Sequence, residues 1–309
     1  MIYTVTLNPA VDKTMIVPRF SANTVNRAER IILDPGGKGI NVSKSIKALG
    51  GESVCLGIVG GDTGRYILSA LDDMDLKHDM VIAEMPTRTN TKIVDPVFRT
   101  NTDLNEAGAA VSLSLLAEVQ KKLHKLAKTG DTVIFAGKNP PGAPDDLLAQ
   151  WTNKLCAAGI RVCVDTVGAP MKHVLREYPF LIKPNTEELE EIVGKSLQTQ
   201  ADVIAAAKEL AVGGVSVVAV SMGADGAVFV TKDETVRSYA PKVDVVSTVG
   251  AGDAMMAALA YYAEKERSLK ELAQMATAVA TATVLVEGSK PASLDAVNAM
   301  REQIIVEKC

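Results

Sequence analysis

The sequence lacks the features that mark secreted and membrane-bound proteins. Among its 309 residues, no apolar run reaches the roughly 20 residues that a membrane-spanning helix needs. The first residues show no basic stretch followed by a long apolar one, so we expect no secretory signal there. These absences predict a cytoplasmic chain.

Cysteine is scarce, and its spacing does not match a metal site. The four cysteines are Cys55, Cys156, Cys163 and Cys309, and no two of them form a CxxC pair. Cys55 and Cys163 lie within apolar runs of strand length. We therefore expect buried, reduced thiols.

The chain also lacks an excess of positive charge. Lys and Arg together number 33 against 37 Asp and Glu, for a formal net charge of −4. This balance gives no general attraction to nucleic acid or to an anionic membrane, and we expect neither as a partner. A site for an anionic ligand must then be built locally from a few basic side chains.

The sequence does contain a regular alternation of strand-length apolar runs and helix-length amphipathic segments. The expected strands are Ile2–Leu7, Ser53–Val59, Thr132–Ala136, Arg161–Asp165, Phe180–Ile182 and Val215–Ser221. The expected helices are Ile40–Leu49, Gly64–Asp72, Ser112–Ala127, Asp145–Ala158, Ala201–Ala211, Gly252–Glu264 and Leu269–Val284. Several strands are apolar throughout, as is typical when helices cover both faces. The pattern predicts an α/β fold with an open, mostly parallel sheet, in which ligands bind beyond the carboxyl ends of the strands.

Two stretches, at about 12–34 and 87–105, interrupt this rhythm. They look like strands but have no helix before the next strand, and the second alternates as a hairpin would, with Asp95-Pro96 near its turn. We interpret them as a small β-sheet lid on a single α/β domain spanning residues 1–309. Ordinary surface hairpins would show the same composition.

The strongest motif is STVGAGD at residues 247–253, between a strand-like run at Val243–Val246 and the expected helix Gly252–Glu264. Its small residues let the backbone approach a ligand closely. The first N–H groups of a helix have no internal partner, so they can form an anion hole for a phosphoryl group.

Asp253 stands at the same helix end. Its carboxylate can accept a hydroxyl proton while the amides of Gly250, Ala251 and Gly252 stabilise the transferring group. An aspartate that only caps the helix would look the same in isolation.

A second motif, DPGGKGINVS at residues 34–43, is a glycine-rich turn that opens a helix. It is not a Walker A loop, because Lys38 is not followed by Ser or Thr. Gly36 and Gly37 allow close approach, Lys38 supplies a charge for a phosphate, and Asn41 can bond to sugar hydroxyls. A plain glycine turn with a solvated lysine is the alternative.

Three further segments fit the same chemistry. Asp12, just after the first strand, could bind two sugar hydroxyls or form an Asx turn. In KPNTEE, Asn185 can cap a helix, and Glu188 could orient water around Mg²⁺ or complete the cap. A nucleotide could lie along Ser221–Gly226, although a plain hairpin looks similar.

Taken in their order along the chain, the five segments resemble the PfkB branch of the ribokinase-like sugar kinases. The resemblance spans essentially the whole chain. It implies that GxGD at 250–253 carries the base and the anion hole. It implies also that GGKGxN at 36–41 binds the sugar and that NxxE at 185–188 governs the metal. The forms TLNPAVD, PGGKGIN and STVGAGD look most like the 1-phosphofructokinases, with the tagatose-6-phosphate kinases as close relatives.

The resemblance also implies an arginine on the lid that holds the substrate's phosphate, and Arg88 matches that position. Relatives usually read GSLPxG after the central strand, whereas this chain has Lys138 in place of that serine. The difference bears on which phosphosugar fits more than on the chemistry. The candidate substrate-binding residues are Asp12, Gly36, Gly37, Lys38, Asn41, Arg88 and Lys138. The candidate nucleotide-binding residues are Lys183, Asn185, Ser221, Gly223, Gly226 and Thr248, with Asn185 and Glu188 acting on the metal through water.

The expected activity is ATP-dependent phosphorylation of a ketohexose monophosphate, with fructose 1-phosphate going to fructose 1,6-bisphosphate. The resemblance implies ATP and Mg²⁺, a monovalent cation such as K⁺, and a homodimer joined through the lids. The alternatives are a tagatose-6-phosphate or fructose-6-phosphate kinase, a ribose or nucleoside kinase, and a sugar-phosphate-binding regulator that has lost catalysis.

Overall fold

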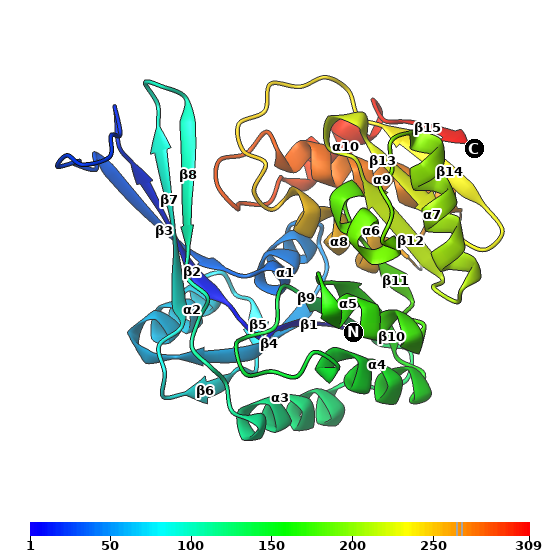
Figure 1. Ribbon diagram of the computed structural model, residues 1–309, viewed down its shortest axis with the longest axis horizontal. Coiled ribbons are helices and arrows are strands. Elements are labelled where there is room, and N and C mark those ends of the chain that lie inside the picture. The colour runs from blue at the N-terminus through cyan, green and yellow to red at the C-terminus, as the bar shows by residue number, and fades with distance from the viewer. Residues whose placement is uncertain (264, 267) are drawn as a thin grey trace.

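A large sheet forms the centre of the molecule, and a second, smaller sheet projects from one side (Figure 1). The structure is a computed structural model that describes residues 1–263, 265–266 and 268–309. In the large sheet the strand order is β15-β14-β13-β12-β11-β10-β9-β1-β4-β5, and β6 pairs with β4. Among the described helices, none is long and apolar enough to cross a membrane.

The strands of the large sheet are mostly parallel. They are β1 (Ile2–Thr6), β4 (Ser53–Gly60), β5 (Lys77–His78), β6 (Val81–Ala83), β9 (Thr132–Ala136), β10 (Arg161–Asp165), β11 (Leu181–Ile182), β12 (Val217–Ser221), β13 (Ala227–Val230), β14 (Thr235–Tyr239) and β15 (Ile305–Lys308). Neighbours from β5 to β12 run parallel, and those from β12 to β15 run antiparallel. The predicted sheet is confirmed.

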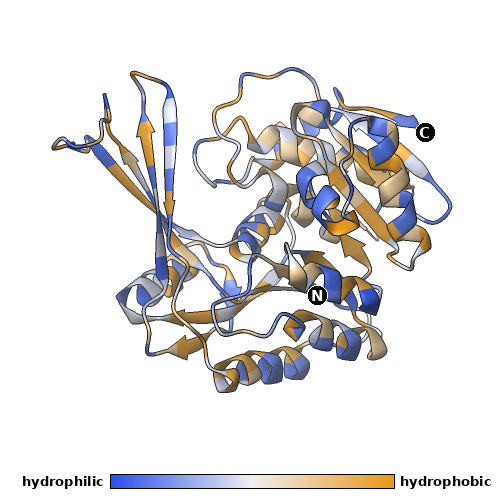
Figure 2. Ribbon diagram, viewed as in Figure 1, coloured by the Kyte–Doolittle hydropathy of each residue, from blue (hydrophilic) through white to orange (hydrophobic). Residues whose placement is uncertain are grey.

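Helices cover both faces of this sheet. They are α1 (Lys38–Ala48), α2 (Gly61–Asp73), α3 (Leu113–Leu126), α4 (Leu147–Ala157), α5 (Ala169–Val174), α6 (Thr186–Val193), α7 (Gln200–Val212), α8 (Ala251–Tyr262), α9 (Leu269–Thr283) and α10 (Leu294–Arg301), with 3₁₀ turns η1 (Leu175–Glu177) and η2 (Gly223–Asp225). In β9, Val133 and Phe135 pack with α3 to α7, whereas Ile134 and Ala136 pack with α1 and α8 to α10. The central strands are therefore apolar throughout, as Figure 2 shows.

The smaller sheet is the predicted lid. Its strands are β2 (Ala10–Ile16), β3 (Arg30–Gly36), β7 (Arg88–Asp95) and β8 (Thr100–Asn105), in the order β3-β2-β7-β8. The β7–β8 hairpin turns after Asp95, whose carboxylate accepts hydrogen bonds from the backbone N–H groups of Arg19, Phe20, Val97 and Phe98. This carboxylate therefore joins the loop after β2 to the turn after β7 at the free end of the lid.

One run that looks like a strand in the sequence does not form one. Val243–Val246 is irregular, with Val245 and Val246 exposed. The N–H of Val246 donates to the carbonyl of Val284 instead of to a strand. The outer edge of β14 is already paired with β15, so no edge there remains for this run. The helix that follows ends at Tyr262, and the last residue predicted for it, Glu264, lies outside the described residues.

Candidate active site

The carboxyl ends of the parallel strands bring most of the predicted residues to one edge of the sheet. Parallel strands end at the same edge, so residues far apart in the sequence meet there. β1 leads into Asn8, β9 into Lys138 and β11 into Lys183, while β10 ends at Asp165 and β12 at Ser221. The lid strand β2 follows β1 directly and rises from the same edge (Figure 1).

Helix α8 presents an open N-terminus at this edge. Gly250 is its N-cap, with a left-handed φ of 81° that favours glycine, and no side chain caps the helix. The first bond within the helix joins the N–H of Ala254 to the carbonyl of Gly250 at 2.8 Å, and Ala251 makes only a long contact of 3.5 Å to the exposed Thr248. The preceding amides, including that of Asp253, can therefore bind an anion.

The carboxylate of Asp253 lies beside these amides and is buried, with 7% of the residue exposed. Asn41 donates a hydrogen bond to its Oδ2 atom at 2.9 Å. Burial and then the charge of Asp165 raise the pKa of Asp253 from 3.8 to about 6, against the opposing effects of Lys38, Asn41 and Lys183. Asp253 is therefore ionised at neutral pH and is a stronger base than an ordinary aspartate.

Two lysines and Asp165 form a buried cluster next to this base. Lys38 Nζ lies 2.7 Å from Asp165 Oδ1, and Lys183 Nζ lies 3.1 Å from Asp165 Oδ2. Burial alone would raise the pKa of Asp165, but the two ammonium groups hold it below its usual value. Burial by itself would lower the pKa of Lys38, but the charge and hydrogen bond of Asp165, together with other nearby carboxylates, outweigh it and raise that pKa above its usual value. A Cβ atom on Gly252 would lie 3.3 Å from Lys183 Nζ, so the cluster adjoins the anion hole.

Asp165 was not among the predicted residues. The available signal was its place as the last residue of an expected strand, at the edge where ligands bind. Lys38 was predicted to hold the sugar's phosphate, and the structure places its ammonium with Asp165 and near Asp253. Its role toward that phosphate stays a prediction.

The sugar-binding candidates on the lid lie close together. Asp12 on β2 is next to Gly36 on β3, where a Cβ atom would lie 2.1 Å from Asp12 Oδ2. Asn90 donates to Asp12 Oδ1 at 3.0 Å. Burial raises the pKa of Asp12, and the bond from Asn90 opposes that rise. Asn90 was not predicted, although its position two residues after Arg88 puts both side chains on one face of β7.

The glycine turn before α1 forms a second open helix end. Gly37 is the N-cap of α1, with a φ of 116°, and no side chain caps this helix either. The N–H of Asn41 donates to the carbonyl of Gly37 at 3.0 Å, which begins the helix. The turn thus directs Asn41 toward Asp253 and leaves the amides before it available to a ligand.

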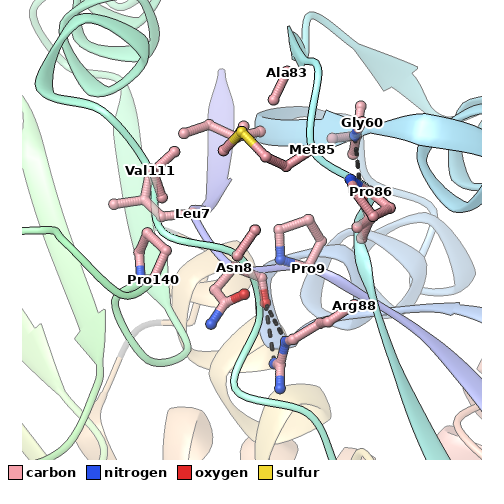
Figure 3. Close-up of a pocket in the computed structure, with 14 residues that line it drawn as sticks. Leu7, Asn8, Pro9, Gly60, Ala83, Met85, Pro86, Arg88, Val111 and Pro140 are labelled. Carbon is pink, nitrogen blue, oxygen red and sulfur yellow. Dashed lines mark hydrogen bonds between the residues drawn. The ribbon is translucent and has the colours of Figure 1, made fainter.

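Arg88 is held at the base of the lid by backbone carbonyls. Its Nε and Nη2 atoms donate to the carbonyl of Asn8 at 3.3 and 3.1 Å (Figure 3). Its Nη1 atom donates to the carbonyl of Glu106 at 2.8 Å. The adjoining cavity, lined by Leu7 and Pro140 among others, measures about 40 Å³ and is too small for a sugar. Backbone carbonyls therefore anchor Arg88 at the base of the lid in this structure.

Lys138 lies in the loop after β9 and is exposed, with no hydrogen bond or ion pair found in the described part of the chain. A Cβ atom on the preceding Gly137 would lie 3.9 Å from the Cβ of Lys38. The loop therefore adjoins the start of α1, and Lys138 is free to contact a ligand.

The nucleotide-binding candidates lie at the carboxyl ends of β11 and β12. The Asn185 side chain accepts from the Glu188 N–H at 2.7 Å, and the Glu188 carboxylate accepts from the Asn185 N–H at 2.9 Å, a capping box at the start of α6. Asn185 also pairs with Ser221 as a parallel bridge. Gly223 begins the turn η2 and Gly226 follows it, with φ values of 58° and 88°, a left-handed region that favours glycine.

Comparison with known proteins identifies the family. The pfkB family carbohydrate kinase model matches residues 5–296. This chain belongs to the pfkB family of carbohydrate kinases. It is 35% identical to a 1-phosphofructokinase of Borreliella burgdorferi over 92% of each chain. It is also 31% identical to the ATP-dependent 6-phosphofructokinase isozyme 2 of Escherichia coli over 95% of this chain and 96% of that one.

A solved structure agrees with this assignment. Phosphofructokinase-2 of Escherichia coli in complex with potassium superposes with a TM-score of 0.94 at 30% identity and covers 98% of each chain. The predicted family and the predicted ribokinase-like fold are both confirmed.

The site of this pfkB kinase fits Mg²⁺ held mainly by phosphates and water. Among the residues that the structure describes, no group of three or more His, Cys, Asp or Glu side chains could hold a metal by itself. Mg²⁺ commonly keeps several waters and binds substrate phosphates with one or two carboxylates. Glu188 uses Oε2 for the cap, which leaves Oε1 for a water.

Proposed function

We propose that this pfkB kinase transfers the γ-phosphoryl group of ATP to the free primary hydroxyl of fructose 1-phosphate, forming fructose 1,6-bisphosphate. The observation that carries this proposal is the position of Asp253, a buried carboxylate beside the uncapped start of α8. The name of the Borreliella burgdorferi relative supports the choice of sugar.

The reaction needs a proton acceptor and a site for the charge of the transferring group. Asp253 takes the proton of the attacking hydroxyl, while the amides from Gly250 to Asp253 bind the oxygens of the phosphoryl group. The ammonium groups of Lys38 and Lys183, shared with Asp165, add positive charge at that point. Little further covalent chemistry is required of the protein.

Substrate binding falls to the lid and to the start of α1. Asp12, Gly37 and Asn41 hold the sugar hydroxyls, and Arg88 and Lys138 hold its phosphate together with Lys38. An arginine fork binds a phosphate bidentately, so Arg88 can gain phosphate contacts by exchanging its backbone partners. Closure of the lid would exclude water that could otherwise hydrolyse ATP.

A second set of residues around the anion hole, distinct from those that bind the sugar, is assigned to the nucleotide and the cations. We propose that ATP lies along Lys183, Ser221, the η2 turn and Thr248. Asn185 and Glu188 would hold Mg²⁺ through water, and the ion would neutralise charge on the phosphates of ATP. A monovalent cation is proposed because the Escherichia coli neighbour is described in complex with potassium. We place this activity in the cytoplasm, where ATP and phosphosugars occur.

A second substrate is favoured by one observation. The Escherichia coli relative is named a 6-phosphofructokinase, which acts on fructose 6-phosphate. Both substrates give fructose 1,6-bisphosphate, so the product does not distinguish them. Tagatose 6-phosphate is the third candidate.

The test is a coupled assay of ADP release with MgATP and each phosphosugar in turn. We expect the highest kcat/KM with fructose 1-phosphate. A higher value with fructose 6-phosphate or tagatose 6-phosphate would replace the substrate and leave the kinase chemistry intact. Tight sugar-phosphate binding in calorimetry without any ATP turnover would instead indicate a non-catalytic regulator.

We also propose a homodimer that is joined through the lid. Strand pairing puts Ile31, Leu33 and Leu104 on the face of the lid opposite Asp12 and Asn90. These three apolar side chains are 52%, 46% and 56% exposed. An apolar face of this kind on a projecting sheet is typical of a surface that a second copy covers.

A further inference from the structure

Lys44, on α1 one turn after Asn41, is a buried charge with no role in the proposed reaction. Only 7% of the residue is exposed. Its ammonium donates to the carbonyl of Pro35 at 2.5 Å, to Oδ1 of Asn41 at 3.3 Å and to Oγ of Ser289 at 3.5 Å. These three bonds account for its three protons.

The bond to Asn41 decides how the Asn41 amide is oriented. An ammonium can only donate and an ionised carboxylate can only accept, and Asn41 lies between Lys44 and Asp253. With the amide oxygen toward Lys44, the amide nitrogen faces Asp253 and donates to it. The reverse orientation would put donor against donor and acceptor against acceptor.

We infer that Lys44 is a positioning residue for phosphoryl transfer. It fixes the Asn41 amide so that Asn41 binds Oδ2 of Asp253, which reserves the other carboxylate oxygen for the hydroxyl of the sugar. In the described part of the chain, Asp253 has no side-chain hydrogen bond other than the one from Asn41. This inference rests on the proposed role of Asp253 as the base.

Other charges act on both ends of this chain of hydrogen bonds. Asp34, Asp12, Asp253 and Cys55 face Lys44, and they oppose the burial that lowers its pKa.

Three charged groups face Asp253 at the other end of this chain of hydrogen bonds. They are Asp165 on β10, Lys38 on α1 and Lys183 in the segment after β11. None of these groups contacts the Asn41 amide in the described structure. Lys44 is thus the group that can hold this amide in one orientation.

A cavity gives experimental access to Lys44. It measures about 300 Å³ and is lined by Lys44, Ser289 and Asp34, and also by Lys47 and Leu76. A small primary amine can therefore reach the space that truncation of Lys44 would leave. Lys47 offers a control, because it lines the same cavity but binds Asp75 at the surface, at 2.7 Å.

The experiment compares wild type, Lys44→Met, Lys44→Ala and Lys47→Met by kcat, KM and pH profile, with folding checked by circular dichroism. We expect Lys44→Met to lower kcat about 10-fold, the value of one charge-assisted hydrogen bond, with a smaller rise in KM because Asn41 also binds the sugar. The acid limb of kcat/KM should move to higher pH, because a freed Asn41 no longer stabilises ionised Asp253. Lys47→Met should match wild type.

Ethylamine or propylamine should restore part of the kcat of Lys44→Ala and leave wild type unchanged. A merely structural role of Lys44 would not respond in this way. An unchanged kcat and acid limb in Lys44→Met would overturn the inference, and so would a loss of activity in Lys44→Ala that no amine restores. Absence of turnover in wild type would refute the proposed function itself, and this inference with it.

Discussion

Replacement of Asp253 by asparagine should inactivate the enzyme and stabilise its fold at the same time. Asparagine has nearly the same shape and can still accept the hydrogen bond from Asn41, but it can neither ionise nor take a proton. Loss of a positioned base lowers kcat by at least ~10². Binding of the sugar phosphate should change little, because Asp12 and Arg88 are unaffected.

The gain in stability follows from the pKa of Asp253, about 6 in the folded chain against 3.8 for an ordinary aspartate. Each pKa unit of difference between the folded and unfolded chain is worth about 1.4 kcal/mol, so ionised Asp253 lowers the stability of the folded state by ~3 kcal/mol. Below pH 3.8 the carboxyl is protonated in both folded and unfolded chains, so the variant gains nothing there. The gain grows as the pH rises and is complete above about pH 6.

The assays are urea denaturation of both proteins at pH 4 and pH 8, and turnover with fructose 1-phosphate at saturating MgATP. Asp295→Asn is the control, since Asp295 also lies in the first turn of a helix but is exposed. It should cost a few tenths of a kcal/mol through the helix dipole. Near-normal turnover in Asp253→Asn, or lower stability than wild type at pH 8, would refute the reasoning.

Three further predictions concern the lid. Arg88→Lys should raise KM for fructose 1-phosphate about 10-fold or more with little change in kcat, since lysine cannot form the bidentate fork; an equal loss in kcat would contradict a binding role. Gly36→Ala should raise the same KM by at least about 10-fold, because the added Cβ would lie 2.1 Å from Asp12 Oδ2 and displace that carboxylate. Steady-state kinetics would measure this change, and unchanged kinetics would show that Asp12 does not bind the sugar. Leu33→Asp with Leu104→Asp should convert a dimer to a monomer in analytical ultracentrifugation, because charge replaces the exposed apolar face; an unchanged mass would place the interface elsewhere.

The architecture could be predicted because buried parallel strands have a distinct local composition. Thr132–Ala136 and Arg161–Asp165 form strands with the predicted bounds, since short apolar runs between amphipathic helices are typical of strands that helices cover on both faces. Val243–Val246 has the same character but is not a strand, because the edge beside β14 is taken by β15. Local hydrophobicity indicates a tendency to pair, whereas the availability of a partner is a property of the whole sheet.

The candidate site shows the same division. Asp253 and the glycine turns could be singled out because helix starts and small residues are visible in the sequence. The pairing of Lys38 with Asp165 joins residues 127 positions apart, and no local pattern indicates it. Asn90 and Lys44 likewise carry no signal in the sequence, since an asparagine on a strand and a lysine on a helix look like ordinary surface residues until their surroundings are known.

Three features follow from residue type and spacing alone: the succession of strands and helices along the chain, the glycines that open α1 and α8, and the carboxylate at the N-terminus of α8. These are local properties, set by residue type and spacing along the backbone. The charge environment of Asp253 exists only in the folded chain. Lys38 and Asn41 come from α1, Asp165 from β10 and Lys183 from the segment after β11, and folding also buries the carboxylate. The pKa of a base depends on everything that surrounds it in space, and the chain must fold before that surrounding exists.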